Sequence, residues 1–517
     1  MAMTALLPNF VCGRWQTGTG AGSTLLDPVL GTALVRVDAT GLDLQDTFDF
    51  ARRQGSAALQ ALTYRERAAL LAQVCQLLQT HRAAYDAIAT ANCGTVKNDS
   101  AVDIDGALFT LGQYAKWGAA LGDARALRDG EPVRLAKEAF LAQHVQVPRP
   151  GLALFINAFN FPAWGLWEKA APALLSGMAV VVKPATATAW LTQRMVQDVV
   201  DAGILPAGAL SIVCGSSAGL LDALESFDVV SFTGSAETAA VVRSHPALAR
   251  HAVRANIEAD SLNSALALPD ATPGTPAFDL LVREVVREMT VKSGQKCTAI
   301  RRILVPEAVY GAAAEAIAAK LAKVSTGNPR NESVRMGALV SRTQFDAVQQ
   351  GVAQLAQAAG ILHDGRTQPL VDADPAVAAC VAPVLLGTRD ADGAQAVHDT
   401  EVFGPVATLL AYRDVPHALA LARRGQGSLV ASLYGDDAAL LGASALALAA
   451  SHGRVHVVTP DVAQAHTGHG NVMPQSLHGG PGRAGGGAEL GGLRALDFYH
   501  QRSAVQASPP VLAALGL

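Results

Sequence analysis

The sequence predicts an α/β protein built on parallel sheets that are covered by helices on both faces. Three observations lead to this prediction. The chain has 517 residues, more than the ~100 to 200 of a typical single domain. Half of the residues are hydrophobic and only 16% are charged, which is typical of large folded cores. After residue 148, short apolar runs alternate with stretches long enough for a helix, the pattern of a doubly covered parallel sheet.

Charge and cysteine content exclude several classes of protein. Forty Lys and Arg against 44 Asp and Glu give a net charge of −4, without the basic patches of a nucleic-acid binder. No segment has the ~18 to 20 apolar residues of a membrane span, and the N-terminus lacks the basic region of a secretory signal. The six cysteines are scattered, with no disulfide or zinc pattern. We therefore expect a cytoplasmic protein with no metal site, no nucleic-acid partner and no membrane association.

The first part of the chain is predicted to be helix-rich, and strands follow it. Leu71, Val74 and Leu78 recur at helical spacing between Tyr64 and Thr80, which predicts an amphipathic helix. The expected strands are Leu152 to Ile156, Ala179 to Val182, Ser211 to Cys214 and Val229 to Phe232. Because ligands bind beyond the carboxyl ends of such strands, the loops that follow them are the first places to search for a site.

A second set of alternating elements predicts a second α/β domain. It includes a strand at Ile300 to Val305 and a helix around Ile317, Leu321 and Val324. Two extended segments, residues 133–149 and the tail after Asp497, fit neither domain. We expect them to pair as an added sheet used for association.

Three side chains are candidates for catalysis, each with an alternative interpretation. Cys297 lies in a polar turn with Lys292 and Lys296, and nearby cations favour a reactive thiolate; a buried structural cysteine is the alternative. Asn160 follows the first apolar run, where its amide can donate to an oxyanion, or it is a turn residue. Glu258 has mostly apolar neighbours, so that a half-buried carboxylate can act as a general base; otherwise it is a surface ion pair.

Phosphate-binding signals are present but individually weak. Thr233, Gly234 and Ser235 follow one predicted strand and open a predicted helix, whose backbone N–H groups can hold a pyrophosphate. Lys183 ends another strand, where a cation can reach a ribose or phosphate, or is simply solvated. The glycine-rich residues 479–487 are too irregular for a P-loop and predict either a flexible lid or a loop of close backbone approach.

The order of these pieces resembles the aldehyde dehydrogenase superfamily over essentially the full length of the chain. The motifs that carry the resemblance are Phe10-Val11-Cys12-Gly13-Arg14-Trp15, Asn160-Phe161-Pro162, Lys183-Pro184, Phe232-Thr233-Gly234-Ser235, Glu258, Gly294-Gln295-Lys296-Cys297 and Glu401-Val402-Phe403-Gly404-Pro405. The resemblance implies a Rossmann-like dinucleotide-binding domain at residues 1–130 and 152–264, and a catalytic domain at residues 265–484. It also implies an oligomerisation element at residues 131–151 and 485–517, and a homodimer.

Catalytic roles follow from the same resemblance. Cys297 would attack an aldehyde, Asn160 and the Cys297 backbone N–H would stabilise the oxyanion, and Glu258 would activate the water that hydrolyses the resulting thioester. The residues implied to bind the dinucleotide are Lys183, Thr186, Thr233, Gly234, Ser235, Glu401 and Phe403. The last two would hold its nicotinamide end.

The cofactor expectation rests on Thr186. In many NAD-preferring relatives a glutamate at this place accepts hydrogen bonds from the adenosine ribose, and its charge repels a 2′-phosphate. Threonine removes that repulsion, so we expect NADP; use of both cofactors is the alternative.

Departures from the common family pattern bear on the substrate. Glu258 is followed by Ala259-Asp260-Ser261, where the family usually has Leu-Gly-Gly. His478 takes a place near the substrate mouth that is often aromatic, and Phe161 and Trp164 are further candidates for the mouth. These features, with residues 473–483 and 496–500, resemble the branch that acts on CoA-thioester semialdehydes, so the expected substrate is a CoA-bound semialdehyde.

Three other functions are alternatives to this one. A CoA-acylating aldehyde dehydrogenase generally lacks the glutamate base, so Glu258 favours hydrolysis. A general aldehyde dehydrogenase remains open. A non-catalytic protein on the same scaffold would be expected to have lost Cys297 or Asn160, and both are present.

Overall fold

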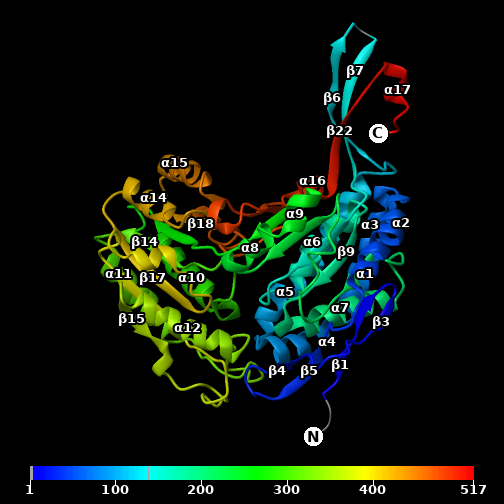
Figure 1. Ribbon diagram of the computed structural model, residues 1–517. Helices are drawn as coiled ribbons and strands as arrows, with labels where there is room; N and C mark the ends of the chain where they lie inside the picture. Colours follow the sequence, from blue (N-terminus) through cyan, green and yellow to red (C-terminus); the bar gives the residue numbers. More distant parts are fainter. Residues whose placement is uncertain (1–3, 138) are drawn as a thin grey trace.

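The computed structural model describes residues 4–137 and 139–517 and confirms the predicted fold class. Two α/β lobes lie side by side, and an arm projects from one of them (Figure 1). Each lobe contains a seven-stranded sheet, with the strand orders β12-β11-β8-β9-β10-β2-β3 and β15-β16-β17-β14-β13-β18-β19. Residues 1–3 of the expected first domain and residue 138 of the expected oligomerisation element lie outside the described residues. The assigned domain roles stay predictions.

The first sheet forms from the apolar runs expected from the sequence. Its parallel strands are β8 (Leu152–Ile156), β9 (Ala179–Lys183), β10 (Leu210–Ile212), β11 (Val229–Thr233) and β12 (Arg254–Glu258). β10 begins and ends earlier than expected, and β9 and β11 each extend by one residue. The antiparallel pair β2 (Asn9–Val11) and β3 (Arg14–Gln16) completes one edge. Helices cover both faces, which is why whole runs of side chains are buried.

Helices of the first lobe begin at recognisable caps. The predicted helix α3 (Tyr64–Thr80) has its expected bounds and starts with a capping box, in which Thr63 and Glu66 each accept a hydrogen bond from the other's backbone N–H. The other helices are α1 (Leu44–Phe50), α2 (Ala57–Gln60), α4 (Arg82–Ile88), α5 (Lys97–Ala120), α6 (Trp164–Leu175), α7 (Ala189–Asp201), α8 (Ala236–Arg243) and α9 (Pro246–His251). A separate small sheet contains β1 (Leu6–Leu7), β5 (Ala33–Val37) and β4 (Ser23–Leu26).

The second lobe has the same layered construction. Its strands are β13 (Ser264–Ala267), β14 (Arg302–Pro306), β15 (Gly360–Asp364), β16 (Val384–Thr388), β17 (Val406–Tyr412), β18 (Ser428–Tyr434) and β19 (His452–Val458). Its helices are α10 (Pro276–Thr290), α11 (Tyr310–Leu321), α12 (Arg342–Leu355), α13 (Gln395–Asp399), α14 (Val415–Arg423) and α15 (Ala438–Ala449). The expected strand at residues 300–305 begins two residues later, and the expected helix ends at Leu321, before Val324.

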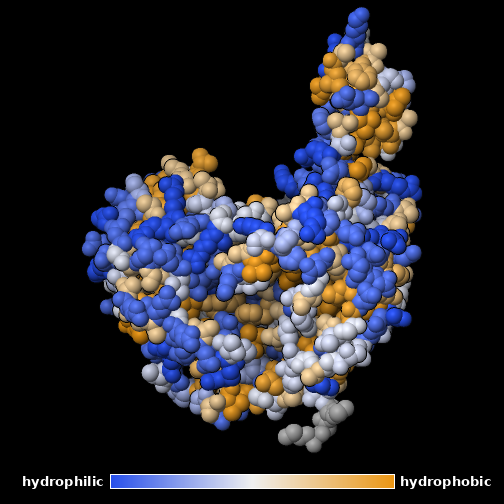
Figure 2. All heavy atoms as spheres, viewed as in Figure 1, coloured by the Kyte–Doolittle hydropathy of each residue, from blue (hydrophilic) through white to orange (hydrophobic). Residues whose placement is uncertain are grey.

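The two extended segments pair as expected. The arm contains β6 (Leu127–Ala136), β7 (Phe140–Pro148) and β22 (His500–Ala507), in the order β22-β7-β6, and the short helices α16 (Leu496–Tyr499) and α17 (Pro509–Ala513) flank β22. Figure 2 shows apolar side chains on the arm, where Val133, Leu135 and Phe140 are exposed. Its use in association stays a prediction.

The length and apolarity of the helices decide whether any of them can span a membrane. Within residues 4–137 and 139–517, every helix is too short or too polar to cross a bilayer.

Candidate active site

Two cavities meet at Cys297. The larger has a volume of about 670 Å³ and is lined partly by residues expected to bind the dinucleotide, including Gly234, Ser235 and Phe403. The smaller, of about 40 Å³, lies on the side of Phe161 and Trp164. The residues that line both cavities are Asn157, Ala158, Asn160, Thr233, Glu258 and Cys297. The three expected catalytic residues therefore lie together on the wall that the cavities share.

A tight turn places Cys297 at this wall. Lys292, Ser293 and Gly294 all have positive φ, and a Cβ at Gly294 would lie 2.2 Å from the Gly404 carbonyl oxygen, so only glycine fits there without strain. The Asn263 side chain donates a hydrogen bond of 2.8 Å to the Cys297 carbonyl oxygen. Burial raises the pKa of the Cys297 thiol well above its usual range, and the negative charge of Glu258 raises it further.

The expectation that neighbouring lysines favour the thiolate is wrong. Lys296 Nζ lies 2.7 Å from Glu288 Oε2, and both side chains are buried. Lys292 Nζ lies 3.8 Å from an Asp103 carboxylate oxygen and 4.3 Å from the centre of the Phe161 ring. Each lysine charge is thus matched by a buried carboxylate.

This pairing predicts a stability effect. Lys296→Met leaves the Glu288 carboxylate buried without its cation, so we expect the free energy of unfolding to fall by about 3 to 5 kcal/mol. Urea unfolding monitored by circular dichroism measures the change. Lys320→Met, at an exposed position of α11, is the matched control. A loss below about 1 kcal/mol for Lys296→Met would contradict the prediction.

Glu258 and Asn160 lie at the carboxyl ends of two parallel strands, β12 and β8, that are separated in the sheet by β11. Asn160 lies in the loop after β8 and is buried, with 9% of its surface exposed. Glu258 is the last residue of β12, and with 3% exposure it is buried, where half-burial was expected. The parallel order of the sheet brings both residues to one edge, which is why residues distant in the sequence converge here.

The glycine-rich stretch at residues 479–487 is a close-approach loop, one of the two interpretations expected. The Ala259 N–H donates to the Ala484 carbonyl, and the Gly487 N–H donates to the Ile257 carbonyl. A Cβ at Gly485 would lie 2.2 Å from the Ile257 carbonyl oxygen. Glycine is therefore needed for this stretch to lie directly on the end of β12, and the contact fixes the backbone that carries Glu258.

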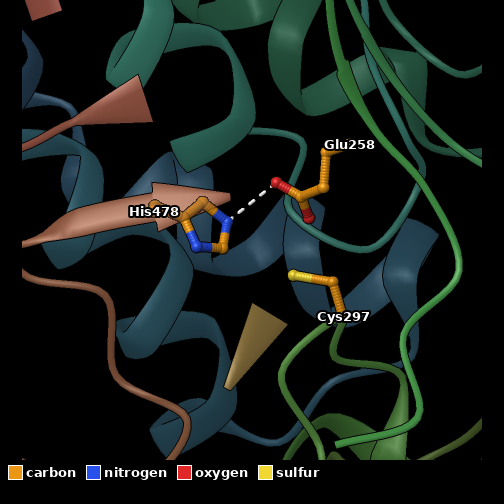
Figure 3. A group of neighbouring side chains, drawn as sticks. All are labelled: Glu258, Cys297 and His478. Atoms are coloured by element: carbon orange, nitrogen blue, oxygen red, sulfur yellow. Dashed lines mark ion pairs between the residues drawn. The ribbon is translucent and has the colours of Figure 1, made fainter. Parts of the chain in front are cut away.

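His478 lines the smaller cavity, as Phe161 and Trp164 do, and its place at a substrate mouth stays a prediction. It belongs to β20 (Leu477–Gly479), which pairs with β21 (Ala488–Leu490), and its Nε2 lies 2.8 Å from Glu258 Oε2 (Figure 3). The Cys297 Sγ, a Glu258 carboxylate oxygen and a His478 ring nitrogen all lie within 4.8 Å of one another. Burial acts to raise the pKa of Glu258, but the His478 charge and hydrogen bond outweigh it and lower the pKa to about 2.

The larger cavity fits a dinucleotide at its phosphate side. Ser235 caps α8, since its side chain accepts a hydrogen bond from the Thr238 N–H, so a helix N-terminus opens beside the cavity. Thr233 lines the cavity, and its buried Oγ1 has no hydrogen-bond partner among the described residues. An unpartnered buried hydroxyl is rare and marks a place for a polar ligand.

The other wall of the larger cavity carries Glu401 and Phe403. The Glu401 carboxylate accepts a hydrogen bond of 3.0 Å from the Ser261 N–H and lies 3.4 Å from Arg301 Nε. Burial raises the pKa of Glu401 to about 7, although Arg301 acts to lower it. The Phe403 ring packs edge-on against Phe159. Both expected residues thus line the cavity close to Cys297.

Lys183 and Thr186 flank the larger cavity and do not belong to its lining, which includes Ala185 between them. The Thr186 hydroxyl donates a hydrogen bond of 3.2 Å to the Gly215 carbonyl oxygen, so its single proton is already used. Burial lowers the pKa of Lys183.

Sequence reasoning missed a group of buried charges next to the smaller cavity. Lys169 Nζ lies 2.9 Å from a Glu168 carboxylate oxygen and 3.2 Å from Glu489 Oε2. Burial raises the pKa of Glu168, and both Glu168 and Lys169 line the cavity. The signal was a charged pair within the otherwise apolar helix α6, because charges are rarely buried without a partner or a function.

This chain belongs to the aldehyde dehydrogenase family, whose model matches residues 15–505. It is thus an oxidoreductase of a family that uses NAD(P). It is 57% identical over 478 residues to the 3,4-dehydroadipyl-CoA semialdehyde dehydrogenase of Aromatoleum evansii, covering 92% of this chain and 93% of that protein. It is also 46% identical over 181 residues to protein MaoC of Klebsiella aerogenes, which spans 35% of this chain and 53% of MaoC.

Solved structures agree with the fold. An NADP-dependent enzyme of E. coli superposes with a TM-score of 0.84 at 22% identity, covering 98% of each chain. Betaine aldehyde dehydrogenase of Staphylococcus aureus in complex with NAD+ gives a TM-score of 0.84 at 22% identity, covering 97% of this chain and 94% of that one. At this level of identity the likeness shows the fold alone.

Proposed function

We propose that this protein oxidises a CoA-bound semialdehyde to the carboxylic acid, with NADP as oxidant and water as the group that releases the product. The observation that carries the proposal is the convergence of Cys297, Asn160 and Glu258 on the wall shared by the two cavities. A nucleophile, an oxyanion donor and a base at one place are what acyl transfer through a thioester needs.

Acylation begins at the Cys297 thiol. Glu258 takes the thiol proton, the sulfur attacks the aldehyde carbon, and the carbonyl oxygen becomes an oxyanion. Asn160 and the Cys297 backbone N–H donate hydrogen bonds to that oxygen. Thr233, Gly234, Ser235, Glu401 and Phe403 would hold a dinucleotide, whose nicotinamide would accept the hydride of the same carbon. A thioester on Cys297 remains.

Glu258 first releases the thiol proton to solvent, and the ionised carboxylate then acts as the base for deacylation. A water attacks the thioester carbon while Glu258 takes its proton. The C–S bond then breaks, the sulfur leaves and the proton returns to it, so that the carboxylic acid and the free thiol are formed. Phe161 and Trp164, which line the smaller cavity, pack edge-on against each other and exclude bulk water from one side of the reacting carbon.

The proposed substrate is 3,4-dehydroadipyl-CoA semialdehyde, on the strength of the relative that is 57% identical over 92% of this chain. A screen of purified protein against CoA-bound and free semialdehydes, following reduced dinucleotide, tests it. Preference for a free aldehyde would contradict the substrate. Product analysis with and without free CoA separates hydrolysis from the CoA-acylating alternative, because only the latter forms an acyl-CoA from the oxidised carbon.

The proposed cofactor is NADP, and Thr186→Glu tests it. Two unit charges about 5 Å apart at an effective dielectric near 20 interact by roughly 3 kcal/mol, which corresponds to about two orders of magnitude in affinity. We therefore expect Thr186→Glu to weaken NADP binding about 100-fold and NAD binding far less, measured by calorimetry. Thr186→Gln is the neutral control. Equal or higher kcat/KM with NAD in the unmutated protein would refute the proposal.

A further inference from the structure

An ion pair joins the proposed base to a histidine that the reaction above does not use. His478 Nε2 lies 2.8 Å from Glu258 Oε2, and 5% of His478 and 3% of Glu258 are exposed. The histidine comes from β20, far from Glu258 in the sequence. Two charges are seldom placed together in a dry site without a role, because removing them from water is costly.

The two oxygens of Glu258 have different surroundings. His478 engages Oε2, whereas the buried Oε1 has no hydrogen-bond partner among the residues that the structure describes. Glu258 lines both cavities together with Cys297, and in Figure 3 its second oxygen lies on the Cys297 side of the carboxylate. One oxygen is therefore held, and the other is free to accept a proton beside the sulfur.

Several charges act on this pair. Glu168 and Lys169 from α6, Glu489 from β21 and the Cys297 thiol surround it. Burial acts to lower the pKa of His478, but Glu258, and then Glu168 and Glu489, outweigh it and raise the pKa. Burial alone would raise the pKa of Glu258. His478 and Lys169 both lower it, and the effect of His478 is the larger. Without His478, the base would gain a proton at a higher pH.

We propose that His478 is a positioning residue: it holds Glu258 ionised and turned toward Cys297, so that Oε1 can take the proton from the water that releases the acyl group. The inference rests on the proposed function, because it needs an acyl group on Cys297. In the assisted step, the water oxygen bonds to the thioester carbon, its proton goes to Oε1, the C–S bond breaks, and Oε1 returns the proton to the sulfur. His478 keeps its proton throughout.

An ester probe tests the role without an aldehyde or a dinucleotide. p-Nitrophenyl acetate acetylates a nucleophilic thiol and releases p-nitrophenolate in a burst, and the slower linear phase then reports deacylation. We compare the unmutated protein with His478→Phe, which keeps a ring and removes both nitrogens, and with His478→Gln, which keeps an N–H donor without charge. Leu477→Gln, on the exposed neighbouring side chain of β20, is the matched control.

The deacylation rate, measured from the linear phase as a function of pH, distinguishes the variants. Deacylation needs ionised Glu258, so its rate falls as the pH drops through the pKa of that group. His478→Phe is expected to keep the amplitude of the burst, to slow the plateau of the linear phase at least tenfold, and to move the pH below which the rate falls up by about one unit or more. His478→Gln is expected to recover much of the plateau rate, because an N–H donor still holds Oε2. It is not expected to restore the pH at which the rate falls, because the positive charge is missing. Leu477→Gln should match the unmutated protein.

Failure of this inference is distinguishable from failure of the proposed function. If the unmutated protein and Cys297→Ala release p-nitrophenolate at the same rate, Cys297 is not the nucleophile, and both the proposed function and this inference are overturned. A normal burst with the same linear phase and the same pH dependence in His478→Phe overturns the role of His478 alone. Equal slowing at every pH would show that the ring serves packing only, and it would overturn the inference as well.

Discussion

Replacing Cys297 with alanine is expected to abolish aldehyde oxidation, by roughly four orders of magnitude or more. Alanine has no nucleophile, so neither the sulfur–carbon bond nor the thioester can form, and a covalent mechanism has no partial substitute for this atom. Dinucleotide affinity should change little, because the larger cavity is lined by more than twenty other residues and the lost atom is one sulfur.

Two measurements check the Cys297 prediction. Steady-state formation of reduced dinucleotide gives the loss of turnover, and calorimetry with NADP gives the affinity. Cys75→Ala, at a partly exposed cysteine on α3, is the control and should retain full activity. Appreciable oxidation by Cys297→Ala would remove this residue from the mechanism.

Glu258→Gln is expected to stop the reaction after acylation. The amide cannot take a proton from water, so deacylation should slow by about two to four orders of magnitude. The acyl group then stays on Cys297. Intact-mass analysis after mixing with semialdehyde and NADP should show a protein heavier by the acyl group, together with one turnover of reduced dinucleotide per site.

The same substitution distinguishes two uses of Glu258. Because Glu258 also takes the thiol proton in the proposed mechanism, the single turnover should itself be slow in Glu258→Gln and should speed up as the pH rises and the thiol ionises directly. Glu332→Gln, at an exposed carboxylate, is the control. Unchanged steady-state turnover without an adduct would show that another group is the base.

The layered fold could be predicted from the sequence because its signals are local. Strands such as β8 and β9 are buried on both faces, so they appear in the sequence as uninterrupted apolar runs. Helix α3 begins where Thr63 and Glu66 form a capping box, and both residues stand within one turn of each other. Strand bounds were less exact, as at β10, because hydrogen bonds to neighbouring strands decide where pairing ends.

Much of the candidate site could also be predicted from the sequence. Asn160, Thr233 and Glu258 follow or end strands of one parallel sheet, and topology alone brings such positions to one edge. Cys297 stood out because a polar turn precedes an apolar strand. The family resemblance then assigned each residue a role, and the cavities show that these residues lie together.

The tertiary structure alone decided how the charges are paired. The sequence placed Lys292 and Lys296 next to Cys297, but the chain directs them to Asp103 and Glu288. The family resemblance placed His478 near a substrate mouth, and only the β20–β21 hairpin shows that this histidine also pairs with Glu258. Coulomb energies depend on distance and on exposure to water, and neither can be read from the order of residues. The sequence by itself therefore determined the family, the layered fold and the kinds of reactive group, while the proton affinities of those groups were set by packing between segments far apart in the chain.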